Sequence, residues 1–481
     1  MLGAALAESS PALAQDGAPE SSPTPTLTVT PTPTPGDENA AAQGEGGPGD
    51  TPAQAPETSA TTEQPGETPT SVPAETSPAE TPTADGEAAF TDTPEGVAAE
   101  ALMQTPTATQ GAEIVPLVMP EDTGNIVPGE YIVVYKKNKG DSKTLKAGRD
   151  KVKEKAGEIK ASYSAAIKGF SARLTAEALH ELRQDPDIAY IEPDQYIHAV
   201  DGGIAEQSTP QILPSGVSGY WGLDRIDQAT VNRDYRFYYP SSAGTGVHVY
   251  VLDSGILTSH EQFEGRASTD YDLINDGRSE SEYYFHGTAV ASIVGGKDTG
   301  VAKNVYLHSV RVLDYEGQGK FSTVAAGLDW VINNHTDPAV VNLSLGGSSV
   351  NSTLNNMVAS TVNAGITVVV SSGNRLGTTD SWDACNWSPA SAPLAITVGA
   401  TTSSDSRDTS YSTYGTCLDL FAPGTNILSA TNTGDTAYVY STGTSMAAPM
   451  VAGAAALYLA DHPSATPTEV TSVILGVATS G

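Results

Sequence analysis

Three side chains of this sequence are of the types that perform nucleophilic catalysis, and each stands at the end of a predicted strand or the start of a predicted helix. Ser445 lies among small residues, in Gly-Thr-Ser-Met-Ala-Ala-Pro, where an apolar helix begins. The free backbone N–H groups and the positive end of the helix dipole favour a developing oxyanion there. The serine is therefore placed to act as a nucleophile, although the same pattern is also typical of an ordinary helix cap.

Asp253 and His286 could supply the carboxylate and the base. Asp253 ends the β-branched run 246–252, which predicts a strand buried on both faces, although an isolated Asp-Ser-Gly more often forms a turn. His286 opens a short apolar helix closed by glycine, where the dipole favours the neutral imidazole that a general base requires. Alone, it would be read as a surface or packed histidine. Together the three follow the order Asp, His, Ser, a known arrangement of the catalytic triad.

The motifs around these residues resemble those of the subtilisin family of serine proteases, in particular its proteinase K and aqualysin branch. The resemblance is carried by Val251–Gly255, His286–Thr288, Asn342–Gly347, Ser372–Asn374 and Gly443–Pro449. It implies an α/β fold with a doubly wound, mostly parallel sheet over residues 215–481. It also implies that His286 removes the Ser445 proton while Asp253 orients the imidazole.

The resemblance assigns further groups around this triad. Asn374 ends a predicted buried strand at 365–374, and it is expected to stabilise the oxyanion together with the backbone N–H of Ser445. An extended peptide substrate is expected between two edge segments, which supply backbone hydrogen bonds. The matching residues are Gly317, Gln318 and Gly319 on one edge, and Ser344, Leu345 and Gly346 on the other.

A calcium site and a disulfide are implied in the same way. In the proteinase K branch, two backbone carbonyls and one carboxylate hold Ca²⁺, and the matching residues here are Pro393, Ala395 and Asp419. Cys385 and Cys417 match positions that are bridged in that branch, whereas in a cytosolic enzyme they would remain thiols. We therefore expect structural Ca²⁺, a disulfide beside it, and no cofactor for catalysis.

Residues 126–200 are predicted to form a separate, small, ferredoxin-like α+β domain. Its predicted elements are a strand at 130–135, a lysine-rich helix at 142–162, a strand at 169–174, a helix at 175–184 and a strand at 188–194. This pattern resembles the subtilisin propeptide, an intramolecular inhibitor and folding chaperone; an unrelated α+β module is the alternative. Because Lys and Arg crowd into this segment and the region after 215 is acidic, opposite charges are expected to guide docking.

The remaining segments are expected to connect and carry these two domains. Residues 1–120 are rich in Pro, Thr and Glu, with no Lys or Arg before Lys136, which predicts a disordered acidic tail. The net charge of −33 argues against a nucleic-acid partner. Residues 201–214 are expected to be a linker between the two domains. We expect the chain to cleave itself at the start of this linker, at a bond within about 200–210. The chain stops soon after a predicted helix at 466–477, so we expect the protease domain to lack the closing strands common in the family.

These features predict a secreted serine endopeptidase, made as a self-processing zymogen, that cleaves exposed protein segments as a monomer. No stretch is long and apolar enough to span a membrane. The acidic tail would be either a cell-surface spacer or a dispensable linker. The first residues lack the basic and apolar parts of a convincing secretion signal. The alternative is an inactive relative that binds peptides in the same groove, which labelling of Ser445 by an irreversible inhibitor would distinguish.

Overall fold

A parallel sheet of seven strands forms the centre of the C-terminal domain in the computed structural model, which describes residues 114–200, 221–231, 233, 236–377 and 380–480. The strand order is β13-β12-β11-β9-β5-β7-β6, and all neighbours run parallel. The strands are β5 (His248–Asp253), β6 (Ala267–Asp272), β7 (Tyr306–Arg311), β9 (Ala339–Leu343), β11 (Thr367–Ser371), β12 (Ile396–Thr401) and β13 (Leu420–Pro423). The predicted sheet architecture is confirmed.

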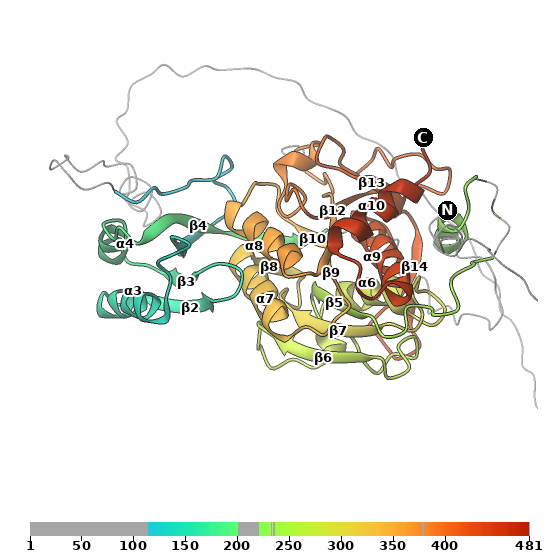
Figure 1. Cartoon of the computed structure of the whole chain (residues 1–481), viewed down its shortest axis with the longest axis horizontal. Helices are drawn as coiled ribbons and strands as arrows, with labels where there is room; N and C mark the ends of the chain where they lie inside the picture. Colours follow the sequence, from blue (N-terminus) through green and yellow to red (C-terminus); the bar gives the residue numbers. More distant parts are fainter. Residues whose placement is uncertain (1–113, 201–220, 232, 234–235, 378–379, 481) are drawn as a thin grey trace, which may run out of the picture. The chain divides into compact units, whose positions relative to one another are not determined.

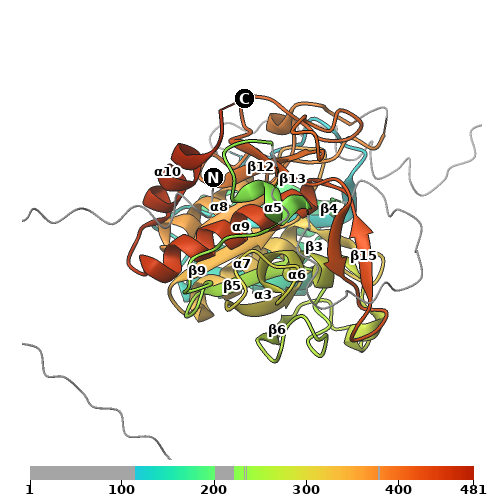
Figure 2. The ribbon, with the colours of Figure 1, turned by 90° about the vertical axis from the view of Figure 1, so that its right-hand side faces the viewer.

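Helices cover both faces of this sheet because successive residues of the central strands are apolar. In β5, Val249 and Val251 join the core with α6 and α9, whereas Tyr250 and Leu252 join the core with α7 and α8. Figures 1 and 2 show these helices packed around the strands. The helices of this domain are α5 (Trp221–Ile226), α6 (His286–Gly295), α7 (Phe321–Asn334), α8 (Ser352–Asn363), α9 (Thr444–Asp461) and α10 (Pro467–Val477). Burial on both faces explains why these strands are continuous apolar runs rather than alternating ones.

The carboxyl ends of β5, β9 and β11 meet at one edge of the sheet, as the parallel arrangement requires. Asp253 is the last residue of β5, Ser344 follows β9, and Asn374 follows β11 by three residues. In doubly wound sheets, this edge carries the functional site next to the point where the strand order reverses. A hairpin of β14 (Ile427–Ala430) and β15 (Tyr438–Ser441) precedes α9.

The N-terminal domain is an antiparallel sheet with two helices. Its elements are β1 (Ile126–Tyr135), α3 (Ser142–Glu154), β2 (Glu158–Tyr163), β3 (Gly169–Arg173), α4 (Ala176–Leu182) and β4 (Ile188–Ala199). The strands are ordered β4-β1-β3-β2 and enclose a core that includes Val133, Phe170 and Leu182. The domain therefore has its own hydrophobic core, as the sequence pattern predicted.

The prediction of one long helix over 142–162 is wrong. The helix ends at Glu154, because Ala156 adopts the left-handed conformation (φ 59°) and Gly157 N–H donates back to the Val152 carbonyl. Residues of β2 then pair with β3, so the order is strand, helix, two strands, helix, strand. The last strand also continues five residues beyond the predicted Asp194.

The structure describes the chain from residue 114, whereas the predicted disordered tail extends to residue 120. Val115 is buried, and Val118 N–H donates to the Ile191 carbonyl at 2.8 Å, so residues 115–118 pack on the N-terminal domain rather than belonging to a disordered tail. The rest of the tail prediction (1–113) and the linker prediction (201–214) lie outside the described residues. Within the described ranges, no helix is long and apolar enough to cross a bilayer.

Candidate active site

Asp253 and His286 form a buried pair at the carboxyl edge of the sheet. His286 Nδ1 lies 2.8 Å from one oxygen of Asp253 and 3.0 Å from the other, and neither residue is accessible to solvent. The same carboxylate accepts the backbone N–H of Ser254 at 2.7 Å. Because a carboxylate only accepts here, it holds the proton on Nδ1 and leaves Nε2 as the basic nitrogen of the neutral ring.

A short polar bridge fixes the start of α6 against the end of β5. Ser254 Oγ donates to the Tyr284 carbonyl at 2.7 Å and accepts the Gly287 N–H at 3.1 Å. Residue 287 must be glycine, because a Cβ there would lie 2.3 Å from the Gly255 carbonyl oxygen. These contacts join the turn after β5 to the start of α6, and they thereby fix the position of the His286 imidazole.

Ser445 lies at the second position of α9, fully buried beneath a peptide carbonyl. Its Oγ is in very short contact with the carbonyl oxygen of Val200, and it lies 3.1 Å from the Ser344 carbonyl. Asn374 Nδ2 donates to the same Val200 oxygen at 3.0 Å. A hydroxyl and an amide donor therefore converge on the oxygen of one carbonyl group, which brings a candidate nucleophile and a candidate oxyanion donor to the same peptide bond.

Thr444 and Ser344 position these two groups. The amide oxygen of Asn374 accepts both the backbone N–H of Thr444 at 3.0 Å and its hydroxyl at 2.9 Å, so Nδ2 must point toward Val200. Ser344 Oγ donates to the Ser445 carbonyl at 2.9 Å and tethers the first turn of α9. Our sequence analysis missed the role of Thr444, although its place between Gly443 and Ser445 was the available signal.

The strand β4 occupies a groove between two edge strands, β8 (Gln318–Lys320) and β10 (Leu345–Gly346). His198 pairs with Gln318 on one side and with Gly346 on the other, while Ala199 pairs with Leu345. Ala199 N–H donates to the Gly317 carbonyl at 2.9 Å, and Val200 N–H donates to the Ser344 carbonyl at 3.3 Å. The two predicted edge segments, including Gly319 opposite Ile197, thus surround an extended peptide.

Carboxylates of the N-terminal domain cap the helices of the C-terminal domain. Asp194 accepts the Ser322 N–H at 3.1 Å and its hydroxyl at 2.5 Å, at the start of α7, whose own N-cap residue provides no side-chain bond. Glu192 accepts the N–H groups of Ser352 and Thr353, both at 3.2 Å, at the start of α8. Both contacts favour a negative charge at a positive helix end. The sequence predicted a strand at 188–194 but not this capping role of its carboxylates.

Burial opposes the charge on these carboxylates. Burial raises the pKa of Asp194 to about 6, although the hydrogen bonds from Ser322 and Gln195 lower it. Burial likewise raises the pKa of Glu192, against the hydrogen bonds from Thr353 and Ser352. We therefore expect docking of the two domains to be accompanied by proton uptake by these groups.

The charges between the domains differ from the expected basic-to-acidic attraction. Among the described residues, the one ion pair between the domains joins Glu130 of the N-terminal domain to Lys320 of β8, at 2.8 Å. Asp329 of α7 accepts backbone N–H groups of Ser164, Ala165 and Ala166 rather than lysine side chains. Most lysines of α3 instead face solvent or carboxylates of their own domain. Within the described ranges, hydrogen bonds from N–H groups to carboxylates, rather than pairs between lysine and carboxylate, are the main charged contacts between the domains.

The structure contains the disulfide between Cys385 and Cys417 that the resemblance implied. Two residues after Cys417, Asp419 accepts the Thr397 N–H at 2.8 Å through Oδ2. Asp419 directly precedes β13, while Pro393 and Ala395 precede the neighbouring strand β12, so all three lie at the same end of the sheet. In the described ranges, no group of three His, Cys, Asp or Glu side chains could hold a metal ion.

Comparison with known proteins agrees with this architecture. Residues 244–481 match the family model of the subtilase family (Peptidase S8), and residues 130–199 match that of peptidase inhibitor I9. An extracellular serine proteinase of Thermus sp. (strain Rt41A) is 46% identical over 390 residues, which are 77% of this chain and 89% of that protein. Alkaline serine exoprotease A of Vibrio alginolyticus is 41% identical over 67% of this chain and 58% of its own length.

A solved structure supports the fold. The crystal structure of fervidolysin from Fervidobacterium pennivorans aligns with a TM-score of 0.59 at 24% identity, over 75% of this chain and 59% of that one. The chain thus belongs to the subtilase family and carries an I9 inhibitor domain in front of the peptidase domain. It is a subtilisin-like serine endopeptidase with an intramolecular inhibitor, and the family resemblance seen in the sequence is confirmed.

Proposed function

We propose that Asp253, His286 and Ser445 are the catalytic triad of this endopeptidase and that the chain cleaves itself after Val200. The observation that carries the proposal is the Val200 carbonyl, which contacts Ser445 Oγ and accepts the Asn374 amide at 3.0 Å. The family membership, the inhibitor domain and the extracellular Thermus relative support a secreted zymogen.

The proposed chemistry assigns one step to each group. His286 Nε2 takes the hydroxyl proton as Ser445 Oγ bonds to the carbonyl carbon of Val200, and Asp253 stabilises the imidazolium. Asn374 Nδ2 stabilises the oxyanion of the tetrahedral intermediate. The imidazolium then protonates the nitrogen of Asp201 as the C–N bond breaks, and water hydrolyses the resulting acyl-enzyme.

Cleavage after Val200 would narrow the cleavage site, which the sequence placed within about 200–210, to one peptide bond. Val200 is buried, and its Cγ2 lies 3.3 Å from where a Cβ on Gly346 would stand, so a larger residue at 346 would crowd the site. Ile197 is buried as well, three residues upstream. Because the strand pairs antiparallel on both sides, the same groove would hold an extended segment of another protein.

Replacement of the nucleophile tests the proposal directly. The purified Ser445→Ala chain is expected to stay full length, whereas the wild-type chain is expected to yield a mature protein that begins at Asp201. N-terminal sequencing and intact mass measure both outcomes. Ser472→Ala, an exposed serine of α10, is the control and is expected to mature normally. A pure Ser445→Ala protein that matured to the same fragments would contradict the proposal.

We also propose that Asp419, with the backbone carbonyls of Pro393 and Ala395, holds a structural Ca²⁺. The donor set is entirely oxygen, which suits a hard cation. One carboxylate oxygen of Asp419 accepts the Thr397 N–H, which leaves the other without a donor among the described residues. The ion would supply positive charge that ties β12 to the segment that carries Cys417.

Thermal unfolding of the Ser445→Ala protein tests this site without relying on activity. EDTA is expected to lower the Tm of the Ser445→Ala protein but not that of the Ser445→Ala/Asp419→Asn protein. An equal loss of stability in both proteins would contradict the assignment of Asp419.

The proposed location outside the cell agrees with the disulfide, since such bonds persist in oxidising compartments. We further propose that the Pro- and Thr-rich residues before 114 act as a spacer at the cell surface. Deleting them is expected to move the enzyme from the cell fraction to the medium. An unchanged distribution would contradict the spacer role.

A further inference from the structure

The register of the strand β4 shows where side chains far upstream of the cleaved bond would lie. Counting back from Val200 as P1, the fifth residue, P5, is Tyr196 and the seventh, P7, is Asp194. Tyr196 pairs with Lys320, the last residue of β8. In an antiparallel pair, two residues upstream on one strand face two residues further along the other, which here is Ser322 at the start of α7. An extended peptide in this register therefore brings its P7 side chain to the start of α7.

The start of α7 holds the carboxylate at P7 in place of a cap of its own. Asp194 accepts the backbone N–H of Ser322 at 3.1 Å through one oxygen and the Ser322 hydroxyl at 2.5 Å through the other. The side chain of Lys320, the residue before the helix, makes no capping bond. Asp194 and Ser322 are both buried. The bound carboxylate identifies the chemical class that this helix start accepts.

A second helix start binds the carboxylate two residues further upstream, at P9. Side chains two residues apart on a strand point to the same side, about 7 Å from each other. Glu192, at P9, accepts the N–H of Ser352 at 3.2 Å through one oxygen. Its other oxygen accepts the N–H of Thr353 at 3.2 Å and the Thr353 hydroxyl at 2.7 Å. The starts of α7 and α8 thus offer two positive helix ends at the spacing of an extended peptide.

These donors belong to the peptidase domain and stay with it when the inhibitor domain leaves. Ser322 is a residue of α7, and Ser352 and Thr353 are residues of α8, whereas the two carboxylates that they bind come from the inhibitor domain. Release also separates Lys320 from Glu130, its ion-pair partner at 2.8 Å. The mature enzyme is then left with helix N–H groups that only water or another acceptor can satisfy.

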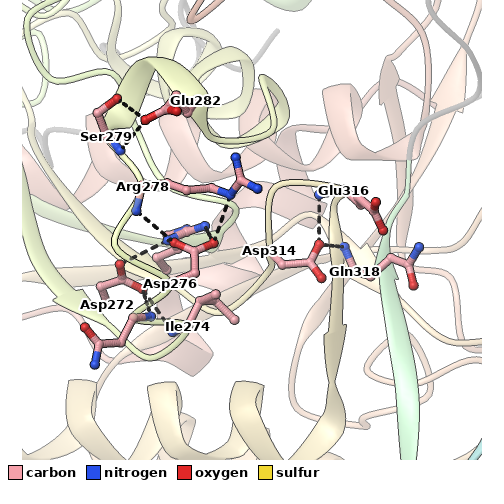
Figure 3. Close-up of polar contacts among 11 residues, drawn as sticks. Asp272, Ile274, Asp276, Arg278, Ser279, Glu282, Asp314, Glu316 and Gln318 are labelled. Carbon is pink, nitrogen blue, oxygen red and sulfur yellow. Dashed lines mark hydrogen bonds and ion pairs between the residues drawn. The ribbon is translucent and has the colours of Figure 1, made fainter.

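The edge that sets this register is closed by bonds within the peptidase domain. Asp314, in the turn before β8, accepts the N–H of Glu316 at 2.9 Å and that of Gln318 at 3.0 Å through Oδ1 (Figure 3). The Asp314 N–H donates in turn to the Gln318 carbonyl at 2.8 Å. Because none of these bonds involves the inhibitor domain, we expect the mature enzyme to keep the edge and its register.

We propose that the starts of α7 and α8 form acid-selective S7 and S9 subsites, so that the mature peptidase prefers extended substrates with an acidic residue at P7 and a second at P9. This inference rests on the proposed function, because it places Val200 at P1. A helix cap of this kind is expected to lower KM about fivefold for an acid at P7. The value of kcat should stay the same, because these contacts lie far from the reacting bond and bind ground state and transition state alike.

Matched peptides test the S7 subsite with the mature enzyme. Each is acetyl-Gln-Pro-X-Z-Tyr-Ile-His-Ala-Val-p-nitroanilide, in which X is P7 and Z is P6. The P7 peptide has Asp at X and Asn at Z, and the shifted peptide has Asn at X and Asp at Z, so both have the same composition and net charge. We expect a KM about fivefold lower for the P7 peptide at about 20 mM salt, and a smaller difference at about 500 mM. Replacing the Gln at P9 by Glu should lower KM about threefold further.

Enzyme variants separate the subsite from the rest of the groove. Ser322→Ala removes the hydroxyl donor but keeps the N–H, so the ratio of the two KM values is expected to fall to about twofold. Ser472→Ala, an exposed serine of α10, is the control and should keep the wild-type ratio. The comparison of peptides on the wild-type enzyme decides the question even where Ser322→Ala fails to mature.

Two results would overturn the subsite: equal KM values for the P7 and shifted peptides on the wild type, or the same ratio in Ser322→Ala as in Ser472→Ala. Both results leave the proposed function intact, because the peptides are still cleaved. Failure of the matured wild type to cleave either peptide would instead contradict the proposed function.

Discussion

The carbonyl oxygen of Val200 accepts a hydrogen bond from the Asn374 side chain at 3.0 Å, although the two residues are 174 positions apart in the chain. This bond joins the end of the inhibitor domain to the carboxyl end of the central sheet. Under the proposed function, the same segment is both the inhibitor that fills the groove and the first substrate of the peptidase.

Asn374→Ala is expected to slow self-cleavage by about 10² to 10³-fold, because one preorganised donor to the oxyanion is lost. The single-turnover rate of inhibitor-domain cleavage, followed by intact mass, measures the effect. Asn363→Ala, at the exposed end of α8, is the matched control. A wild-type rate in Asn374→Ala would show that this amide does not stabilise the transition state.

Asp253→Asn is expected to reduce the same rate by about 10⁴-fold while the fold is retained. An amide at 253 can donate as well as accept, so it no longer holds the proton on His286 Nδ1 and the base loses its correct tautomer. Asp337→Asn, whose side chain is 72% exposed, is expected to cleave at the wild-type rate. If both variants matured equally fast, Asp253 would have no orienting role.

Retention of the cleaved inhibitor domain is expected to depend on pH through Asp194. Its pKa is about 6 in the docked state, above the ordinary value near 4 that applies after release, so docking takes up a proton between these values. The ionised form weakens docking above about pH 6, and docking strengthens as the pH falls toward about 4. We expect the inhibitor domain to be held about tenfold more tightly at pH 5 than at pH 7.5.

The onset of peptidase activity after self-cleavage, measured across this range, reports the release. In Asp194→Asn the contribution of this group disappears, so the pH dependence should become shallower. Glu192, whose pKa burial also raises, is expected to supply part of the remaining slope. The same slope in Asp194→Asn as in the wild type would rule out Asp194 as the linked group.

Replacing both Cys385 and Cys417 by Ser is expected to destabilise the peptidase domain by about 3 to 4 kcal/mol, because the disulfide closes a segment with a sequence separation of 32. Guanidinium unfolding in the Ser445→Ala background measures the loss without self-digestion. The parent Ser445→Ala protein is the reference. Identical unfolding midpoints would indicate that the bond contributes nothing measurable.

The main strands and the α9 helix of the peptidase domain could be predicted from the sequence, because each is marked by a pattern within a short segment. Continuous apolar runs predicted β5 and β11 as strands buried on both faces, and the small residues after Ser445 predicted α9. Their carboxyl ends then had to share one edge, so the proximity of Asp253 and Asn374 followed from sheet geometry.

Other features depend on contacts between distant segments, which a linear pattern does not contain. The lysine-rich segment 142–162 looked helical throughout, yet pairing with β3 turns Glu158–Tyr163 into a strand. The extension of β4 to Ala199 exists because β8 and β10 pair with it. The caps that Glu192 and Asp194 place on α8 and α7 join residues at least 128 positions apart.

Labelling of the matured enzyme by a fluorophosphonate, followed by mass mapping of the adduct, tests the central claim most directly. The account predicts one adduct on Ser445, formed after the inhibitor domain leaves and abolished in Ser445→Ala. A matured protein that takes no label, or that carries it on another residue, would contradict the assignment of Ser445 as the nucleophile.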